Sequence, residues 1–207
     1  MREQILRDII DLETAMFRSL NIGEPMPEDR IRPFRLMRWM TYSVLADDTL
    51  ASWLADLQAA RQTGRNVLTE KYARIDNLIP PIKNNPRIGE IVAAEVRWME
   101  ELHDRYPQMI RRQADDAALF EKYAACELET WSDTSIELYH RDVCAALRER
   151  RNLPEERYNN LYGAWAKARW RSWKRRRRTD RLGMLAERFF EDCGAPAGVP
   201  FFCVHNY

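Results

Sequence analysis

The fold is decided by residues 49–74, TLASWLADLQAARQTGRNVLTEKYAR, which recur 86 residues later as residues 135–160, SIELYHRDVCAALRERRNLPEERYNN. Seven of the 26 aligned pairs are identical, and Trp53/Tyr139 and Lys71/Arg157 are conservative pairs. The identical pairs are Asp56/Asp142, Ala59/Ala145, Ala60/Ala146, Arg65/Arg151, Asn66/Asn152, Glu70/Glu156 and Tyr72/Tyr158. Self-similarity at a fixed spacing indicates a repeated structural unit.

The segments that precede these stretches also correspond, at a shift of 82 residues that pairs Ile9, Glu13 and Leu20 with Ile91, Glu95 and Leu102. The difference of four residues fits an insertion near residues 106–116. We therefore predict a tandem duplication of a four-helix unit, with repeat one at about 2–80 and repeat two at about 87–163. Because such units pack their apolar faces together, residues 1–207 should form one pseudo-twofold domain.

Helix-favouring composition and helical spacing of apolar residues predict an all-α, single-domain helical bundle of about nine helices. Glycine and proline together make up only 17 of 207 residues, which is too few for many short strands and turns. The expected helices are 2–20, 33–45 (opened by Pro33), a third from Asp47 or Asp48 to Gly64, 67–77, 87–104, 115–130, 133–150, a long one from Pro154 to about 181, and 184–192. No helical pattern extends over the tail 195–207.

Several protein classes are excluded at this level. The charged start predicts no secretory signal, and no apolar run reaches the ~20 residues that span a membrane. The four cysteines form no Cys-x-x-Cys pair, so we expect reduced thiols in a cytoplasmic protein rather than a thiolate zinc site. Glycine-rich phosphate loops and the motifs of serine hydrolases and zinc proteases are absent from the sequence.

Five ionisable residues fall within the apolar arcs of five predicted helices, and they are Glu13, Arg38, Glu95, Glu127 and His140. One interpretation is a buried salt-bridge network that fixes helix register. A second is a pocket between the repeats for a small polar or anionic ligand, in which Arg38 binds an anionic group and the carboxylates and His140 act as catalytic acids and bases.

A metal centre is a third interpretation of the same residues. Di-iron bundles combine single glutamates with Glu-x-x-His motifs, and this chain contains Glu100-x-x-His103 and Glu137-x-x-His140. The candidate ligands are Glu13, Glu95, Glu127, His140, Glu100 and His103. Nothing in the sequence requires a cofactor.

The repeated corners Arg65-Asn66 and Arg151-Asn152 precede new helices and have two interpretations. Capping of the following helix by asparagine explains them structurally. Alternatively, they bind an anion near the twofold axis, together with the repeated tyrosines. The candidate ligand-binding residues are therefore Arg38, Arg65, Asn66, Tyr72, Arg151, Asn152 and Tyr158.

Residues 165–181, WAKARWRSWKRRRRTDR, contain nine basic residues and one acidic residue, a local charge of +8 within a chain of net charge +1. One interpretation is a solvated face that balances an acidic body. The other is a binding site for nucleic acid or an acidic protein, because clustered arginines contact phosphates. The candidate polyanion-binding residues are Lys167, Arg171, Lys174, Arg175 and Arg178.

Five strings carry a resemblance to a known family. They are FRLMR at 34–38, SWLADL at 52–57, GRNVLTEKYAR at 64–74, RWMEEL at 97–102 and RRNL at 150–153. They resemble a bacterial family catalogued only as a domain of unknown function, number four thousand one hundred and twenty-five in its series, over about residues 5–163. The resemblance implies a helical, cytoplasmic bacterial protein and implies no activity.

Overall fold

A computed structural model of the chain describes residues 1–20, 26–107 and 116–173, with residues 116 and 164–173 described by their backbone alone. In these ranges the chain forms eight α-helices and no strand, so the all-α prediction is confirmed for them. The helices are α1 (Arg2–Arg18), α2 (Glu28–Tyr42), α3 (Asp47–Gln62), α4 (Val67–Ile75), α5 (Pro86–Arg105), α6 (Asp116–Leu128), α7 (Asp133–Arg148) and α8 (Leu153–Trp173). None of these helices is long and apolar enough to cross a membrane.

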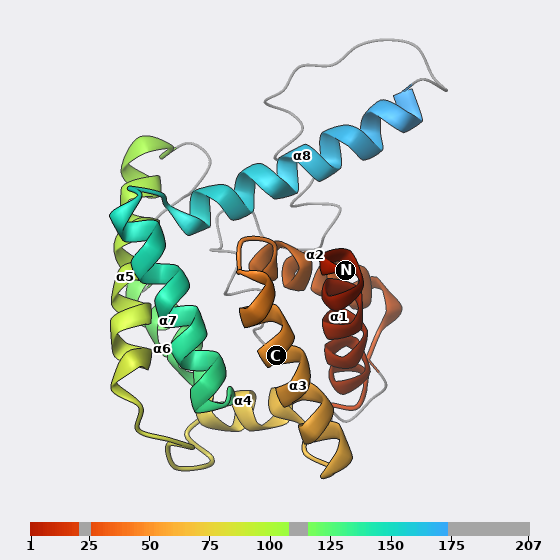
Figure 1. Cartoon of the computed structure of the whole chain (residues 1–207). Helices are drawn as coiled ribbons and strands as arrows, with labels where there is room; N and C mark the ends of the chain where they lie inside the picture. The colour runs from red at the N-terminus through yellow and green to blue at the C-terminus, as the bar shows by residue number, and fades with distance from the viewer. Residues whose placement is uncertain (21–25, 108–115, 174–207) are drawn as a thin grey trace.

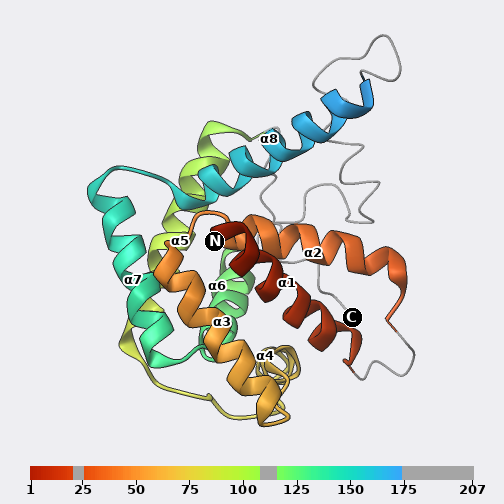
Figure 2. The ribbon, with the colours of Figure 1, turned by 45° about the vertical axis from the view of Figure 1, so that its right-hand side comes forward.

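The helices form two groups of four that pack against each other (Figures 1 and 2). Helix α1 packs on α2, α3 and α4, and α5 packs in the same way on α6, α7 and α8. The groups meet where α3 contacts α7, α4 contacts α6, and α2 contacts α8. One hydrophobic cluster contains buried residues from both groups, among them Ile9, Trp53, Ile91 and Ile136. Below, residues 1–80 and 86–173 are called the first and second halves.

Each half caps a helix of the other half with an aspartate. Asp56 of α3 accepts hydrogen bonds at the start of α7, from Ser135 Oγ at 2.6 Å and from the backbone N–H three residues earlier at 3.0 Å. Asp142 of α7 accepts them at the start of α3, from Thr49 Oγ1 at 2.7 Å and from the backbone N–H three residues earlier at 2.9 Å. Helix starts leave backbone N–H groups unsatisfied, so an acceptor at this place stabilises the helix. The two contacts lie at corresponding positions and join the two halves.

Helices α3 and α7 also end in the same way. In each, a backbone N–H just beyond the helix donates to a carbonyl five residues earlier at 2.8 Å. This ending needs one residue in the left-handed region, which is Gly64 (φ +72°) after α3 and Arg150 (φ +56°) after α7. Glycine adopts this conformation freely, whereas arginine is strained by its Cβ.

Most expected helix boundaries agree with the structure to within a few residues, and the largest difference is at α2. This helix was expected to open at Pro33, but it begins at Glu28, after Pro27, and Pro33 lies inside it. Proline at this early position removes only one intrahelical hydrogen bond, and Phe34 and Met37 bury the face that follows. The ninth helix, 184–192, the end of the long helix after residue 173 and the tail 195–207 lie outside the described residues.

We expect Arg150→Gly to raise the free energy of unfolding by about 1 kcal/mol, because it relieves the left-handed strain of an exposed arginine. Chemical denaturation measures this change. The matched variant at the corresponding position, Gly64→Ala, should lower the stability by a similar amount. Equal effects of the two substitutions would contradict this account of the helix ends.

Candidate functional site

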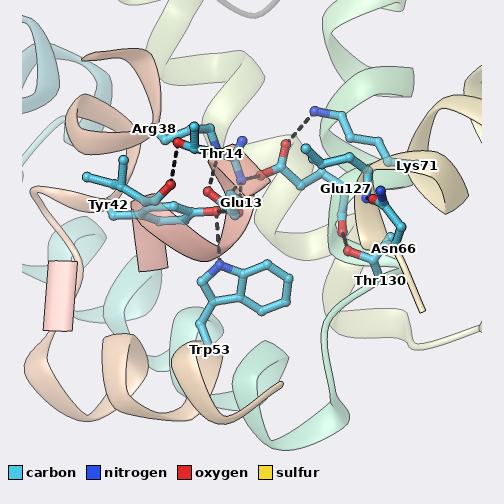
Figure 3. Close-up of polar contacts among 11 residues, drawn as sticks. Glu13, Thr14, Arg38, Tyr42, Trp53, Asn66, Lys71, Glu127 and Thr130 are labelled. Atoms are coloured by element: carbon cyan, nitrogen blue, oxygen red, sulfur yellow. Dashed lines mark hydrogen bonds and ion pairs between the residues drawn. The ribbon is translucent and has the colours of Figure 1, made fainter. Parts of the chain in front are cut away.

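The first group of buried charges, here called the Glu13 cluster, comprises Glu13, Arg38, Tyr42, Lys71 and Glu127. The carboxylate of Glu13 is fully buried and binds the Arg38 guanidinium through two bonds, Nε–Oε2 at 2.7 Å and Nη2–Oε1 at 2.6 Å. The Tyr42 hydroxyl donates to Glu13 at 2.5 Å and accepts from the Arg38 guanidinium. Figure 3 shows these side chains converging from α1 and α2.

The Glu13 cluster also contains one residue from the second half of the chain, Glu127. Glu127 of α6 accepts from Arg38 Nη2 at 2.6 Å and from Lys71 Nζ at 2.7 Å (Figure 3). Trp53 of α3 donates its indole N–H to the Tyr42 oxygen at 3.0 Å. Two carboxylates and two cations therefore balance each other in this cluster.

The second group, here called the Glu95 cluster, comprises Glu95, Tyr139 and Arg157. Arg157 donates to both oxygens of Glu95, at 2.7 and 2.8 Å, and to the Tyr139 hydroxyl at 2.8 Å. The Tyr139 hydroxyl in turn donates to Glu95. All three side chains are buried, and the one carboxylate is balanced by the one guanidinium.

The two clusters contain the same glutamate–arginine–tyrosine triad, but they build it from different helices. Glu13 and Glu95 correspond at the shift of 82 residues. In the first half, the arginine and the tyrosine both come from α2, whereas in the second half they come from α8 and α7. Arg157 corresponds to Lys71, which binds Glu127 instead of Glu13. The two halves therefore neutralise the corresponding glutamate with arginines from different helices.

Burial and charge set the protonation of these groups. Burial alone would raise the pKa of Glu127, but Arg38 and Lys71 hold it well below its usual range. Burial alone would lower the pKa of Arg157, yet Glu95 raises it above its ordinary value. Burial raises the pKa of the Tyr42 and Tyr139 hydroxyls, so both stay protonated as donors. Glu127 is therefore ionised at neutral pH, and the two tyrosines are hydrogen-bond donors.

A cavity of about 40 Å³ lies between the two clusters. The charged side chains in its wall are Glu127 from one cluster and Glu95 and Arg157 from the other, and Thr41, Tyr42 and Tyr139 add hydroxyl groups. The remaining wall is apolar and comes from α5 and α6, with Leu45 from the segment after α2 and Trp131 from the segment between α6 and α7. This volume accommodates about three water molecules, at about 10–15 Å³ each, or a comparably small ligand.

Two buried donors beside the cavity have no hydrogen-bond partner among the described residues. They are Nε of Arg157 and Nε1 of Trp131, whose residues are 2% and 3% exposed. Both residues belong to the cavity wall. An unsatisfied buried N–H costs about 1–3 kcal/mol, so such donors are normally paired with water or a ligand.

His140 was expected in the same buried group, but the structure places it elsewhere. Its Nε2 lies 2.7 Å from the carboxylate of Glu90, whose side chain is 51% exposed, and its ring contacts Cys144. The buried carboxylates are bound instead by Arg38, Lys71 and Arg157. Glu95 and Glu127 line the cavity, whereas Glu13 and Arg38 are not among its wall residues.

The structure does not assemble the expected metal ligands. Among the described residues, no three His, Cys, Asp or Glu side chains lie close enough to hold a metal ion. Glu13, Glu95 and Glu127 are each bound by arginine or lysine. Glu100 and His103 lie near the end of α5 and have contacts of their own. The di-iron interpretation therefore lacks its donor set in the described part of the chain.

The repeated corners act as helix caps. Asn66 accepts from two N–H groups at the start of α4 and donates to the Met16 carbonyl at 2.9 Å. Asn152 accepts at the start of α8 and donates to the Trp98 carbonyl at 2.9 Å. The adjacent arginines of both corners bind the glutamate five residues later, and the Tyr72 and Tyr158 hydroxyls have pKa values raised by burial.

The side chains of the candidate polyanion-binding residues lie outside the described part of the structure. Lys167 and Arg171 lie on α8, where only the backbone is described, and Lys174, Arg175 and Arg178 lie outside the described residues. Binding of nucleic acid or an acidic protein by residues 165–181 therefore stays a prediction.

Four members of the buried clusters were not predicted from the sequence, and they are Tyr42, Lys71, Tyr139 and Arg157. The signal was present for three of them, because Lys71 pairs with Arg157 and Trp53 with Tyr139 at the shift of 86 residues. A conservative pair by itself indicates only that both side chains pack in similar places. Which carboxylate each side chain binds is seen only in the structure. Tyr42 has no such signal, since its counterpart at the same shift is Leu128.

We expect Glu127→Gln to lower the free energy of unfolding by about 3 kcal/mol at pH 7, because Lys71 loses its carboxylate partner. The folded-state pKa of Glu127 is depressed, so its contribution is complete above about pH 4.3 and is lost as the pH falls further. Urea denaturation between about pH 7 and pH 3 measures both effects. The difference from the wild type should shrink towards pH 3.

The matched control is Glu121→Gln, an exposed position on the same helix, which should change stability little at any pH. A destabilisation by Glu127→Gln that is the same at pH 7 and pH 3 would contradict the ion-pair account.

Comparison with known proteins gives one match. The model of a family described as "Protein of unknown function (DUF4125)" matches residues 3–168, which include both clusters and the cavity wall. No curated protein and no solved structure matches the chain. The resemblance inferred from the five sequence strings is thus confirmed, and the chain belongs to the DUF4125 family.

Proposed function

We propose that this protein binds a small polar molecule in the cavity between the Glu13 and Glu95 clusters. The observation that carries the proposal is the pair of buried, unpartnered donors, Arg157 Nε and Trp131 Nε1, on side chains that both line this cavity. A ligand that accepts hydrogen bonds from them removes the cost of leaving them unsatisfied. We assign the entrance of the cavity to the space between α2 and α6, because the partly exposed wall residues are Thr41, Ala124 and Glu127.

The residues expected to be catalytic have structural roles in this proposal. Glu13 is engaged by Arg38 and Tyr42, and Glu95 by Arg157 and Tyr139. Both oxygens of each carboxylate are already bound by donors of the protein. We therefore assign Glu95 and Glu127 to the cavity wall and assign Glu13 and Arg38 to holding α1, α2 and α6 in register around it.

We further propose that the two halves are a tandem duplication within one domain, related by a pseudo-twofold axis between α3 and α7. Support comes from contacts that agree at corresponding positions, such as the reciprocal caps by Asp56 and Asp142 and the bonds of Asn66 and Asn152 to the Met16 and Trp98 carbonyls. On this proposal the cavity lies where the two copies of the unit differ.

Binding is tested by titrating the full chain with acetamide, sodium acetate and guanidinium chloride, which are similar in size and cover three charge states. The reporter is the indole N–H of Trp131 in proton–nitrogen spectra, assigned with Trp131→Phe. We expect at least one probe to shift this resonance, because the indole N–H gains an acceptor or a changed neighbour.

The variant Ala124→Leu should abolish the shift by filling the cavity, and Ala124→Val serves if leucine prevents folding. The matched control is Ala118→Leu, on the exposed face of the same helix, which should leave the titration unchanged. If no probe shifts the Trp131 resonance, or if the shift survives in Ala124→Leu, this proposal is wrong.

A further inference from the structure

The cavity lies beside the position that corresponds to Arg38 of the first half. Helices α2 and α6 align at the shift of 86 residues, where Phe34 pairs with the identical Phe120. The same shift pairs Arg38 with Ala124, so the second half has a methyl group where the first has a guanidinium.

The residues around the two positions correspond as well. In the first half, Arg38 contacts Glu13, Tyr42 and Glu127. Their counterparts are Glu95 at the shift of 82 residues, and Leu128 and Thr41 at the shift of 86. All three counterparts line the cavity, as does Ala124 itself. The cavity therefore lies beside the position that corresponds to the Arg38 side chain, next to the guanidinium that Arg157 places on Glu95.

The charges at the two positions differ, and this difference defines the ligand. Arg38 is attracted by two carboxylates, but at the cavity Glu95 is already neutralised by Arg157, and Thr41 replaces the second carboxylate. Glu127 also reaches the cavity wall, where Arg38 and Lys71 neutralise it. A cation would lie beside Arg157 without a free counter-charge, and an anion would lie beside two buried carboxylates.

The unpartnered hydrogen-bonding groups also restrict the chemistry of the ligand. The unpartnered atoms, Arg157 Nε and Trp131 Nε1, are both donors, so the ligand must present an acceptor. A neutral group avoids the large desolvation cost of bringing an unpaired charge into a buried site.

We infer that the cavity accepts a neutral planar group of about four heavy atoms, such as a carboxamide or a urea, with its oxygen directed to Arg157 and Trp131. This inference rests on the proposed function, and it names the chemical class of the ligand. The position of Ala124 makes that residue the determinant of access, because any larger side chain there occupies the space of the group.

The ranking of the three probes tests the class. Acetamide, acetate and guanidinium are titrated at equal ionic strength, and affinities are read from the backbone amides of Thr41 and Ala124. We expect millimolar binding of acetamide, as befits a ligand of four heavy atoms, and at least about tenfold weaker binding of acetate and guanidinium. Trp131→Phe should weaken acetamide binding by about fivefold, because it removes one donor.

The possible outcomes separate the two proposals. If acetate or guanidinium binds more tightly than acetamide and Ala124→Leu still blocks binding, the cavity is a ligand site but the neutral class is overturned. Unchanged affinity for acetamide in Trp131→Phe, with the variant folded, also overturns the assigned orientation. If no probe binds, the proposed function itself fails.

Discussion

The structure depends on the requirement that a carboxylate removed from water be neutralised and fully hydrogen-bonded. Glu13 is 0% exposed, and its two oxygens are satisfied by Arg38 and Tyr42 from a neighbouring helix. Removing one partner from such a pair leaves an uncompensated buried charge, which costs about 3–5 kcal/mol. The pairing therefore ties the register of α1 to that of α2, and through Glu127 it ties both helices to α6.

The second half satisfies the same requirement with different residues, and this difference has a structural consequence. Because Arg157 reaches Glu95 from α8, α6 needs no arginine at the position that corresponds to Arg38. Ala124 occupies that position and leaves a cavity beside the salt bridge. If the halves arose by duplication, as we propose, the copies kept the buried glutamate and diverged in how they neutralise it. The proposed ligand site is a product of that divergence.

The cavity differs from a packing defect in the chemistry of its wall. Natural cores contain few voids, and an apolar void has no polar group that needs a partner. Here two buried donors beside the space have no partner among the described residues. The carboxylates and cations of the two surrounding clusters balance each other, so the residues around the space carry no net charge. This combination favours a small neutral acceptor over an ion.

Helical spacing and the internal repeat predicted most of the described helices, the corresponding segments of the two halves and the burial of Glu13, Arg38 and Glu95. These features follow from local spacing, because a helix fixes which residues share a face and a repeat fixes which positions correspond. Which buried charges pair with each other depends on how the helices pack. Glu127 pairs with Lys71 across the two halves, while His140, although it lies in an apolar arc of α7, turns to Glu90. The partner of a buried charge depends on how separate helices are placed in three dimensions, and side-chain spacing within one helix carries no information about that placement.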